Sequence, residues 1–367
     1  MTKIDRYIAR AVLGATALVL LVLSGLDLLF TVIDELGDTD DNYSAIEALW
    51  FVLLQFPAHL YELLPMAALI GALSGLGVLA SSNELVVMQA AGVRNTRIVW
   101  AVMKPAMLLM ALGLVLGEWI VPQLQVRAEV FRSTANNEAV GLSRYGHWER
   151  DGRTFMHFNT IEPQGVLYGV SAFEFDENRQ LVRTVEAERA VYRGDSEVVS
   201  VFSGEPNWVL ETGRERVFSR TGDEVIAGHQ AFVSLPWRMD LTPELLQVLI
   251  IDPDEMAISD LYQYAERFER QGQNADGYFL SFWKKLLQPL TTAALVFVAI
   301  SFIFGPLREA TMGSRLFTAI SFGLGFTIVQ RLLQTVSLVY QVSPLPAVLL
   351  PIVLCAGFGW LLFRRAA

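Results

Sequence analysis

Six stretches of the sequence are apolar over the roughly 20 residues that a helix needs to cross the hydrocarbon of a bilayer. They cover residues 12–33, 60–80, 98–121, 286–304, 316–340 and 345–363. A long, more polar segment separates the first three stretches from the last three. The pattern predicts an α-helical membrane protein with six transmembrane helices and a domain inserted between the third and the fourth.

The start of the second stretch is interrupted. Apolar residues begin at Ala45, but Pro57, His59, Glu62 and Pro65 follow within the same region. Because proline removes a backbone donor and clashes with the preceding helical turn, we predict that residues 45–57 form an interfacial helix or a broken extension.

The basic residues of the short loops predict the orientation in the membrane. With six spans, one side receives Lys3, Arg6, Arg10, Arg94, Arg97, Arg308, Arg315, Arg364 and Arg365. The opposite short loops, residues 34–45 and 341–344, contain no lysine or arginine. Positive residues favour the cytoplasmic side, so both termini are predicted to be cytoplasmic and residues 122–278 to lie outside the cytoplasm.

In the inserted segment, the hydrophobic residues occur in short runs instead of long apolar stretches. Between His147 and Pro236 it runs in short β-rich pieces, such as TFMHFNTI, VLYGVSAFEF and QAFVSLPW, separated by turn sequences such as DENR and RTGD. This spacing predicts an all-β domain, either an antiparallel sandwich or an open roll. An amphipathic helix over about residues 256–271 is predicted to lead back to the membrane. The chain thus divides into residues 1–121, 122–278 and 279–367.

Composition supports a membrane protein and excludes several enzyme classes. The chain is 53% hydrophobic and 18% charged, with a mean hydropathy of +0.40 and a net charge of −10, which argues against nucleic-acid binding. It contains no GxxxxGK[ST] motif, so it cannot cradle a nucleotide in a P-loop. The four histidines (His59, His147, His157 and His229) are scattered, and the single cysteine, Cys355, lies in the last span. We therefore predict no catalytic residues, metal site or cofactor in this chain.

The loop between the second and third spans predicts a short cytoplasmic helix over about residues 82–92. Ser81 or Ser82 can cap it, Glu84 lies in its first turn, and Gly92 ends it. Its apolar flank is Leu85, Val86 and Met88. An exposed acid beside such a flank fits either a helix on the membrane surface or one that docks into another protein, and the pattern leaves both open.

Several motifs together resemble the LptF/LptG permeases of the lipopolysaccharide exporter. They are IDRYIAR at the start, LPMAALIGALSGLGVLASSNELVVMQAAGV, GEWIVPQ, IDPDEMAISDLYQYAERFERQGQNADGYFLSFWKKLLQPL, and SFIFGPLRE followed by MGSR. These motifs cover both membrane halves in order, whereas the β-region is similar only in position and character. ELVVMQAAG and GEWIVPQ are closer to the LptG branch than to the LptF branch.

The resemblance implies an inner-membrane permease that takes lipopolysaccharide from the outer leaflet and passes it through periplasmic β-jellyroll domains. It implies a heterodimer with the LptF paralogue, an LptB ATPase dimer that holds the ATP and magnesium, the single-span LptC, and the bridge protein LptA. Under this resemblance, Glu84, Leu85, Val86, Met88 and Gly92 couple to the ATPase. The alternative is an ATP-driven permease that moves a periplasmic domain, for signalling or mechanical work, without carrying lipid.

Two sets of residues are candidates for contacting lipopolysaccharide. Arg127, Arg132, Lys284 and Lys285 lie at the outer ends of the spans, where they could pair with phosphates. Phe155, Phe158, Phe173, Phe175 and Trp208 could line an acyl-chain slot or simply form the core of the β-domain. Where relatives have lysines beside the first span, this chain has Asp34, Glu35, Asp38, Asp40 and Asp41. We expect that loop to point away from the substrate, the alternative being that divalent cations bridge it to the phosphates.

Overall fold

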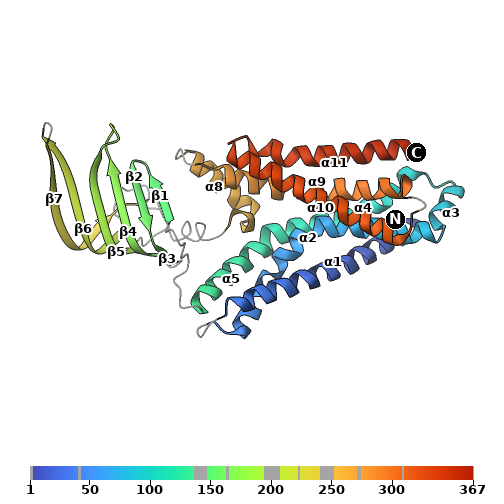
Figure 1. The fold of residues 1–367 in the computed structure, drawn as a ribbon, viewed down its shortest axis with the longest axis horizontal. Helices are drawn as coiled ribbons and strands as arrows, with labels where there is room; N and C mark the ends of the chain where they lie inside the picture. The colour runs from blue at the N-terminus through green and yellow to red at the C-terminus, as the bar shows by residue number, and fades with distance from the viewer. Residues whose placement is uncertain are drawn as a thin grey trace.

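A bundle of long helices and a β-sheet at one end of it make up the molecule (Figure 1). The computed structural model describes residues 3–39, 43–135, 147–162, 165–193, 207–221, 224–239, 252–270, 274–307 and 310–366. Six helical stretches are long and apolar enough to cross a membrane, which confirms the predicted number. The elements before the sheet are α1 (Lys3–Gly37), α2 (Ala45–Ser81), α3 (Glu84–Ala90), α4 (Asn95–Val115), the π-helical η1 (Leu116–Ile120) and α5 (Val121–Ala135). Those after it are the 3-10 turn η2 (Pro253–Glu255), α8 (Ile258–Arg270), α9 (Asp276–Phe304), α10 (Met312–Val339) and α11 (Pro344–Ala366).

Helices α2 and α9 form the centre of the bundle. In their apolar windows 72% and 61% of the residues are buried, against 11% in both α1 and α10. Two glycines let α1 approach α2 closely, because a Cβ at Gly71 would stand 2.2 Å from the hydroxyl of Thr16 and one at Gly75 would stand 2.8 Å from the carbonyl of Ala11. Small residues at such a spacing are a common means of close helix packing in membranes.

The prediction for residues 45–57 is wrong, because they form the first part of a single helix α2. The carboxylate of Glu47 accepts hydrogen bonds from the backbone N–H of Ser44 at 2.8 Å and from its hydroxyl at 2.7 Å, which starts the helix at this point. Pro57 and Pro65 lie inside α2. Membrane helices tolerate such prolines because neighbouring groups satisfy the freed carbonyls.

The third helical stretch also extends beyond its prediction. Instead of ending at residue 121, it continues through η1 and α5 to Ala135, and the first described strand begins at His147. Residues 122–135 therefore belong to the helical part, whereas the sequence assigned them to the β-domain. Their mixed polar composition gave no hydropathy signal.

The inserted domain is all-β, as predicted. Its strands are β1 (His147–Asp151), β2 (Thr154–Phe158), β3 (Thr160–Glu162), β4 (Val166–Phe175), β5 (Leu181–Tyr192), β6 (Trp208–Thr221) and β7 (Glu224–Trp237). They pair antiparallel in the order β1-β2-β4-β5-β6-β7, with β3 beside β4. The described strands thus form one open sheet, and a further β-rich piece of the sequence, EVVSVFSG at residues 197–204, lies outside the described residues.

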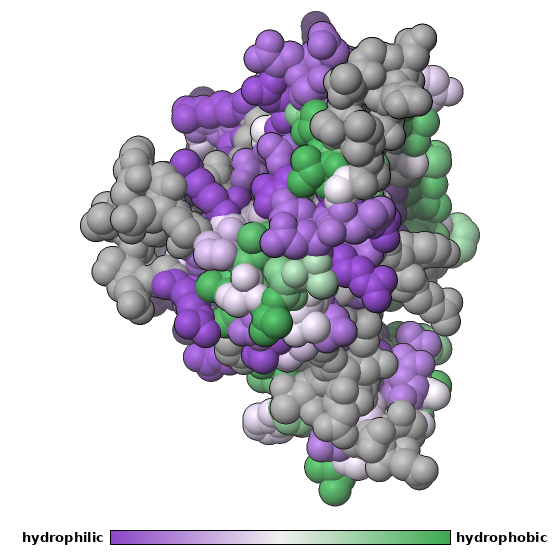
Figure 2. All heavy atoms as spheres, turned by 90° about the vertical axis from the view of Figure 1, so that its left-hand side faces the viewer, coloured by the Kyte–Doolittle hydropathy of each residue, from purple (hydrophilic) through white to green (hydrophobic). Residues whose placement is uncertain are grey.

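The two ends of the molecule differ in surface character. Seen from the end that carries the sheet, the described surface is mostly hydrophilic with small apolar patches (Figure 2). Helices α1 and α10 instead expose large apolar side chains, among them Leu21, Phe30, Phe317 and Leu332, each at least 60% exposed. This division fits helices that face lipid or other helices and a sheet that faces water.

Candidate functional site

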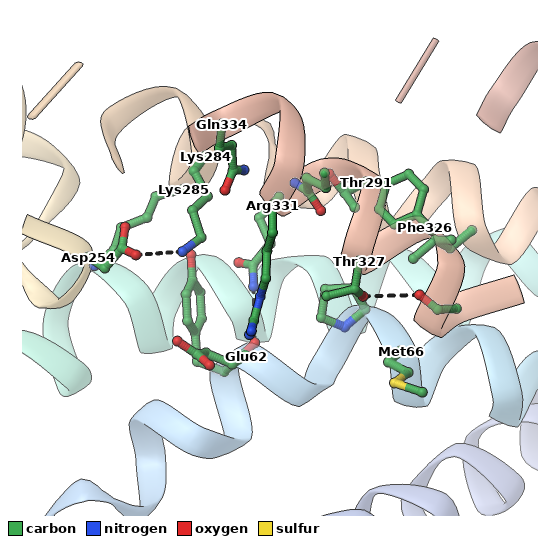
Figure 3. A pocket seen from close by; sticks show the side chains of 16 residues that line it. Glu62, Met66, Asp254, Lys284, Lys285, Thr291, Phe326, Thr327, Arg331 and Gln334 are labelled. Carbon is green, nitrogen blue, oxygen red and sulfur yellow. Dashed lines mark hydrogen bonds and ion pairs between the residues drawn. The ribbon is translucent and has the colours of Figure 1, made fainter. Parts of the chain in front are cut away.

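A polar cavity of about 150 Å³ lies between α2, α9 and α10 (Figure 3). The polar residues around it include Glu62, Lys284, Lys285, Gln288, Arg331 and Gln334. Met66 and Phe326 form part of its apolar wall. Polar and ionisable groups are costly within membrane helices and usually mark a pathway or a site, so this cavity is the leading candidate.

Arg331 and Glu62 supply opposite charges to this cavity. Figure 3 shows the Arg331 side chain extending from α10 toward Glu62 on α2. Close by, the side-chain amide nitrogen of Gln334 is buried without a hydrogen-bond partner in the described part of the chain. Gln288 donates to the backbone carbonyl of Tyr61 at 3.0 Å. Arg331 is not among the site residues predicted from the sequence, although an arginine inside an apolar stretch is itself a signal.

Lys284 and Lys285 also border the cavity, but both have partners in the chain. Lys284 Nζ pairs with Asp254 at 2.7 Å, and the buried Lys285 donates to the carbonyl of Met256. Burial opposes ionisation of Asp254, yet the Lys284 ammonium and the hydrogen bonds from Lys284 and Ser281 hold the pKa of this carboxyl below its usual range. Lys284 remains partly exposed, so of these two lysines, both predicted phosphate contacts, it is the accessible one.

Arg132 and Arg127 lie elsewhere, on α5. Arg132 pairs with Glu35 at 3.1 Å and with Asp38 at 3.1 Å, and its guanidinium lies 5.0 Å from the ring centroid of Phe51. Opposite charge thus brings Glu35 and Asp38 to Arg132, one of the predicted phosphate contacts, while the expectation that the acidic loop points away from the substrate stays a prediction. Asp40 and Asp41 lie outside the described residues. Arg127 is exposed, and neither arginine borders the cavity.

The short helix α3 differs in detail from its prediction. Its N-cap is Asn83, in the left-handed region at φ 60°, whereas Ser82 donates to the carboxylate of Glu84 at 3.0 Å. Gly92, at φ 87°, allows the turn in which the N–H of Val93 bonds to the carbonyl of Met88. The predicted apolar flank of Leu85, Val86 and Met88 is divided between the bundle core and the surface.

Leu85 is 4% exposed within the bundle core, and Met88 packs partly against that core. The large exposed apolar residues of α3 are Val86 and Val87. Leu85 therefore anchors α3 to the bundle, while Glu84 keeps part of its surface accessible beside these valines.

The five predicted slot aromatics lie on two faces of the sheet. Phe158 and Trp208 are fully buried in the core of the β-domain. Phe155 is the register partner of Phe173 and makes an edge contact with Phe175, with centroids 5.6 Å apart, on the opposite face. Successive residues of a strand point to opposite faces, so Phe155 and Phe158 cannot line the same slot.

One further polar contact joins α1 and α2. His59 Nδ1 lies 2.7 Å from a carboxylate oxygen of Asp27, the carboxylate that lies inside the first predicted span. Among the described residues, no group of three or more histidines, cysteines or carboxylates is placed to hold a metal ion.

Comparison with known proteins agrees with this architecture. The lipopolysaccharide export system permease LptF/LptG family matches residues 6–365. The chain is 36% identical to lipopolysaccharide export system permease protein LptG of Escherichia coli strain K12, over 99% of this chain and 98% of that protein. It is 32% identical to the LptG protein of Haemophilus influenzae, over 100% of this chain and 99% of the relative. The chain therefore belongs to the LptF/LptG family of lipopolysaccharide export permeases.

Proposed function

We propose that this chain is the permease subunit that takes lipopolysaccharide from the outer leaflet of the inner membrane and delivers it to the periplasmic β-domain. The observation that carries the proposal is the polar cavity of Arg331, Glu62 and Lys284 within otherwise apolar helices. A phosphorylated sugar headgroup needs cationic and hydrogen-bonding partners, and its acyl chains need apolar surface beside them. The cavity and the exposed faces of α1 and α10 offer both.

The membrane partner in this proposal is the LptF paralogue. Apart from the adjacent backbone of their own helices, no described atom lies within 4 Å of where a Cβ would stand at Gly14, Gly25, Gly313 or Gly325, all of which lie on α1 and α10. These glycines leave room for another helix to approach closely. LptC, as a single-span protein, would occupy part of the same surface.

Energy comes from an LptB ATPase dimer, which binds the ATP and magnesium. The exposed end of α3, with Glu84 beside Val86 and Val87, fits a docking element because its Leu85 is fixed in the bundle core. This arrangement requires α3 and both termini to be cytoplasmic and the sheet to be periplasmic, where the bridge protein LptA receives the lipid.

The two faces of the sheet provide the test. A photocrosslinking residue at Phe158 should capture lipopolysaccharide from reconstituted complex only when ATP is present, because its face is the apolar interior of the domain. The matched control is the same crosslinker at Phe173, on the other face, which should capture little. Equal capture at both positions, or capture without ATP, would contradict the proposal and favour a permease that moves its domain without carrying lipid.

A further inference from the structure

The N-terminus of α8 is capped by a residue that lies far away in the sequence. Glu118, in η1, accepts a hydrogen bond from the backbone N–H of Ile258 at 2.8 Å and another from the hydroxyl of Ser259 at 2.8 Å. The first N–H groups of a helix lack partners inside the helix, and a carboxylate there also interacts favourably with the helix dipole. The contact fastens α8 to the third membrane helix.

We propose that Glu118 is a positioning residue that couples movement of the membrane helices to the β-domain through α8. The proposal rests on the proposed function, since it concerns how ATP-driven movement of the bundle reaches the sheet.

The segment around Glu118 also adjoins the cavity. A Cβ at Gly117 would stand 2.9 Å from a ring carbon of Tyr61, so η1 lies directly against α2 at this point. Tyr61 borders the cavity, and its carbonyl accepts the hydrogen bond from Gln288 of α9. Gly117 and Glu118 both lie in the π-helical turn η1, and such turns often occur at functional positions. A change in the packing of α2 and α9 around the cavity therefore acts directly on the segment that caps α8.

A second set of bonds ties the start of α8 to α9. Asp254 accepts hydrogen bonds from Ser281 at 2.7 Å and from Lys284 at 2.7 Å. Two residues later in the chain, the carbonyl of Met256 accepts a hydrogen bond from Lys285, which is 2% exposed. The first residues of α8 are thus held by η1, and the short segment before them is held by α9. Charge-assisted bonds of this kind are among the strongest available to side chains.

Helix α8 also contacts the core of the sheet. Its Tyr264 packs against the small buried cluster of Met256 and Leu261, against which Phe282 of α9 also packs. The same ring packs against the core cluster of the sheet, which contains Trp208 and Met239. Contacts therefore run without a break from the cavity through Tyr61, η1 and α8 to the interior of the β-domain.

Variants of Glu118 test this role in the reconstituted full complex. Glu118→Ala removes both acceptors, so we expect lipopolysaccharide captured per ATP hydrolysed to fall roughly tenfold while assembly and ATP hydrolysis stay near wild type. Glu118→Gln should keep the ratio within about twofold, because its amide oxygen can still accept the Ile258 N–H. The control is Glu266→Ala, which breaks an exposed ion pair with Arg270 on the same helix and should change nothing.

A second measurement does not depend on lipid. Spin labels at the exposed positions Gln263 of α8 and Leu108 of α4 should report a distance that stays constant with ATP in the wild type, because Glu118 fastens α8 to the third membrane helix, and that changes with ATP in Glu118→Ala. A wild-type capture ratio in Glu118→Ala, or an equal fall in ATP hydrolysis and capture, would overturn the proposal. If the wild-type complex itself captures no lipid, the proposed function fails, and the distance measurement alone decides: a distance that stays constant in Glu118→Ala as well would overturn the role of Glu118.

Discussion

The guanidinium of Arg315 on α10 donates a hydrogen bond to the backbone carbonyl of Gly77 on α2, and its Nε donates to the carbonyl of Leu307. Arg315 is 2% exposed, and a Cβ at Gly77 would stand only 3.2 Å from its side chain. The sequence suggested only a topology signal for this arginine. In the structure it also fixes α10 to the end of α2 that precedes α3.

Replacing Arg315 should therefore destabilise the bundle. Arg315→Lys keeps the charge but cannot reach both carbonyls with one ammonium, so we expect a loss of about 1–3 kcal/mol in the free energy of unfolding. Denaturant unfolding of the purified protein in detergent measures this loss. The control is Arg365→Lys, at the exposed end of α11, and equal stability of both variants would contradict the assignment.

The raised pKa of Glu255 predicts that the stability of the protein depends on pH. Burial and the negative charges of Asp252 and Glu129 raise the pKa of Glu255 to about 7, and Gln125 donates to its carboxyl group at 2.7 Å. Since the pKa in the folded state lies above the ordinary value, the folded state binds the proton more tightly. The contribution of this group to stability is fully present below the ordinary pKa of about 4.5 and is lost as pH rises through 7.

We therefore expect the unfolding temperature of the wild type to fall between pH 5 and pH 8 and that of Glu255→Gln to fall much less. The difference should be on the order of 2 kcal/mol, allowing for solvent access to this partly exposed side chain. Thermal scans of both proteins at several pH values measure it. Parallel pH profiles would show that another group is responsible.

The sequence predicts the six spans and the inserted β-domain well because both depend on local periodicity. Hydropathy averaged over a span does not depend on distant residues, and turn sequences divide the strands locally. The continuous α2 was missed because the prediction rested on the interrupting residues, such as Pro57 and Pro65, and did not use the capping box of Ser44 and Glu47. Glu118 was missed for another reason: its partners lie on another element, and no periodic pattern indicates a contact between Glu118 and Ile258, 140 residues apart. Arg331 could have been found, because an arginine inside an apolar stretch is itself a signal.

Glu84 should be required for binding the ATPase. Glu84→Arg reverses the charge at the exposed end of α3, so we expect loss of ATPase copurification and of transport together, while the fold is kept because Leu85 holds the helix in the core. Pull-down of the ATPase with the affinity-tagged permease measures this. The control is Glu269→Arg on α8, an exposed carboxylate far from α3 in the chain. Unchanged assembly in Glu84→Arg would exclude a role in docking.

Arg132 gives the last prediction, because its carboxylate partners compete with any phosphate. Glu35 is held beside it by the hydroxyl of Tyr43 at 3.0 Å, and burial together with this hydrogen bond raises the pKa of Tyr43. A lipid phosphate that pairs with Arg132 must displace Glu35 and Asp38 from the guanidinium. If Arg132 binds phosphate, weakening these two competitors should favour the lipid.

We expect the double variant Glu35→Gln, Asp38→Asn to bind lipopolysaccharide more tightly than the wild type, by roughly tenfold, because the guanidinium is then free for bidentate phosphate contact. Binding to purified complex, with and without a chelator, measures this, and Asp34→Asn, an exposed neighbour, is the control. A cation bridge predicts the opposite result, since the carboxylates would then be ligands rather than competitors. Weaker binding in the double variant, together with a chelator-sensitive loss in the wild type alone, would establish that bridge and exclude direct competition at Arg132.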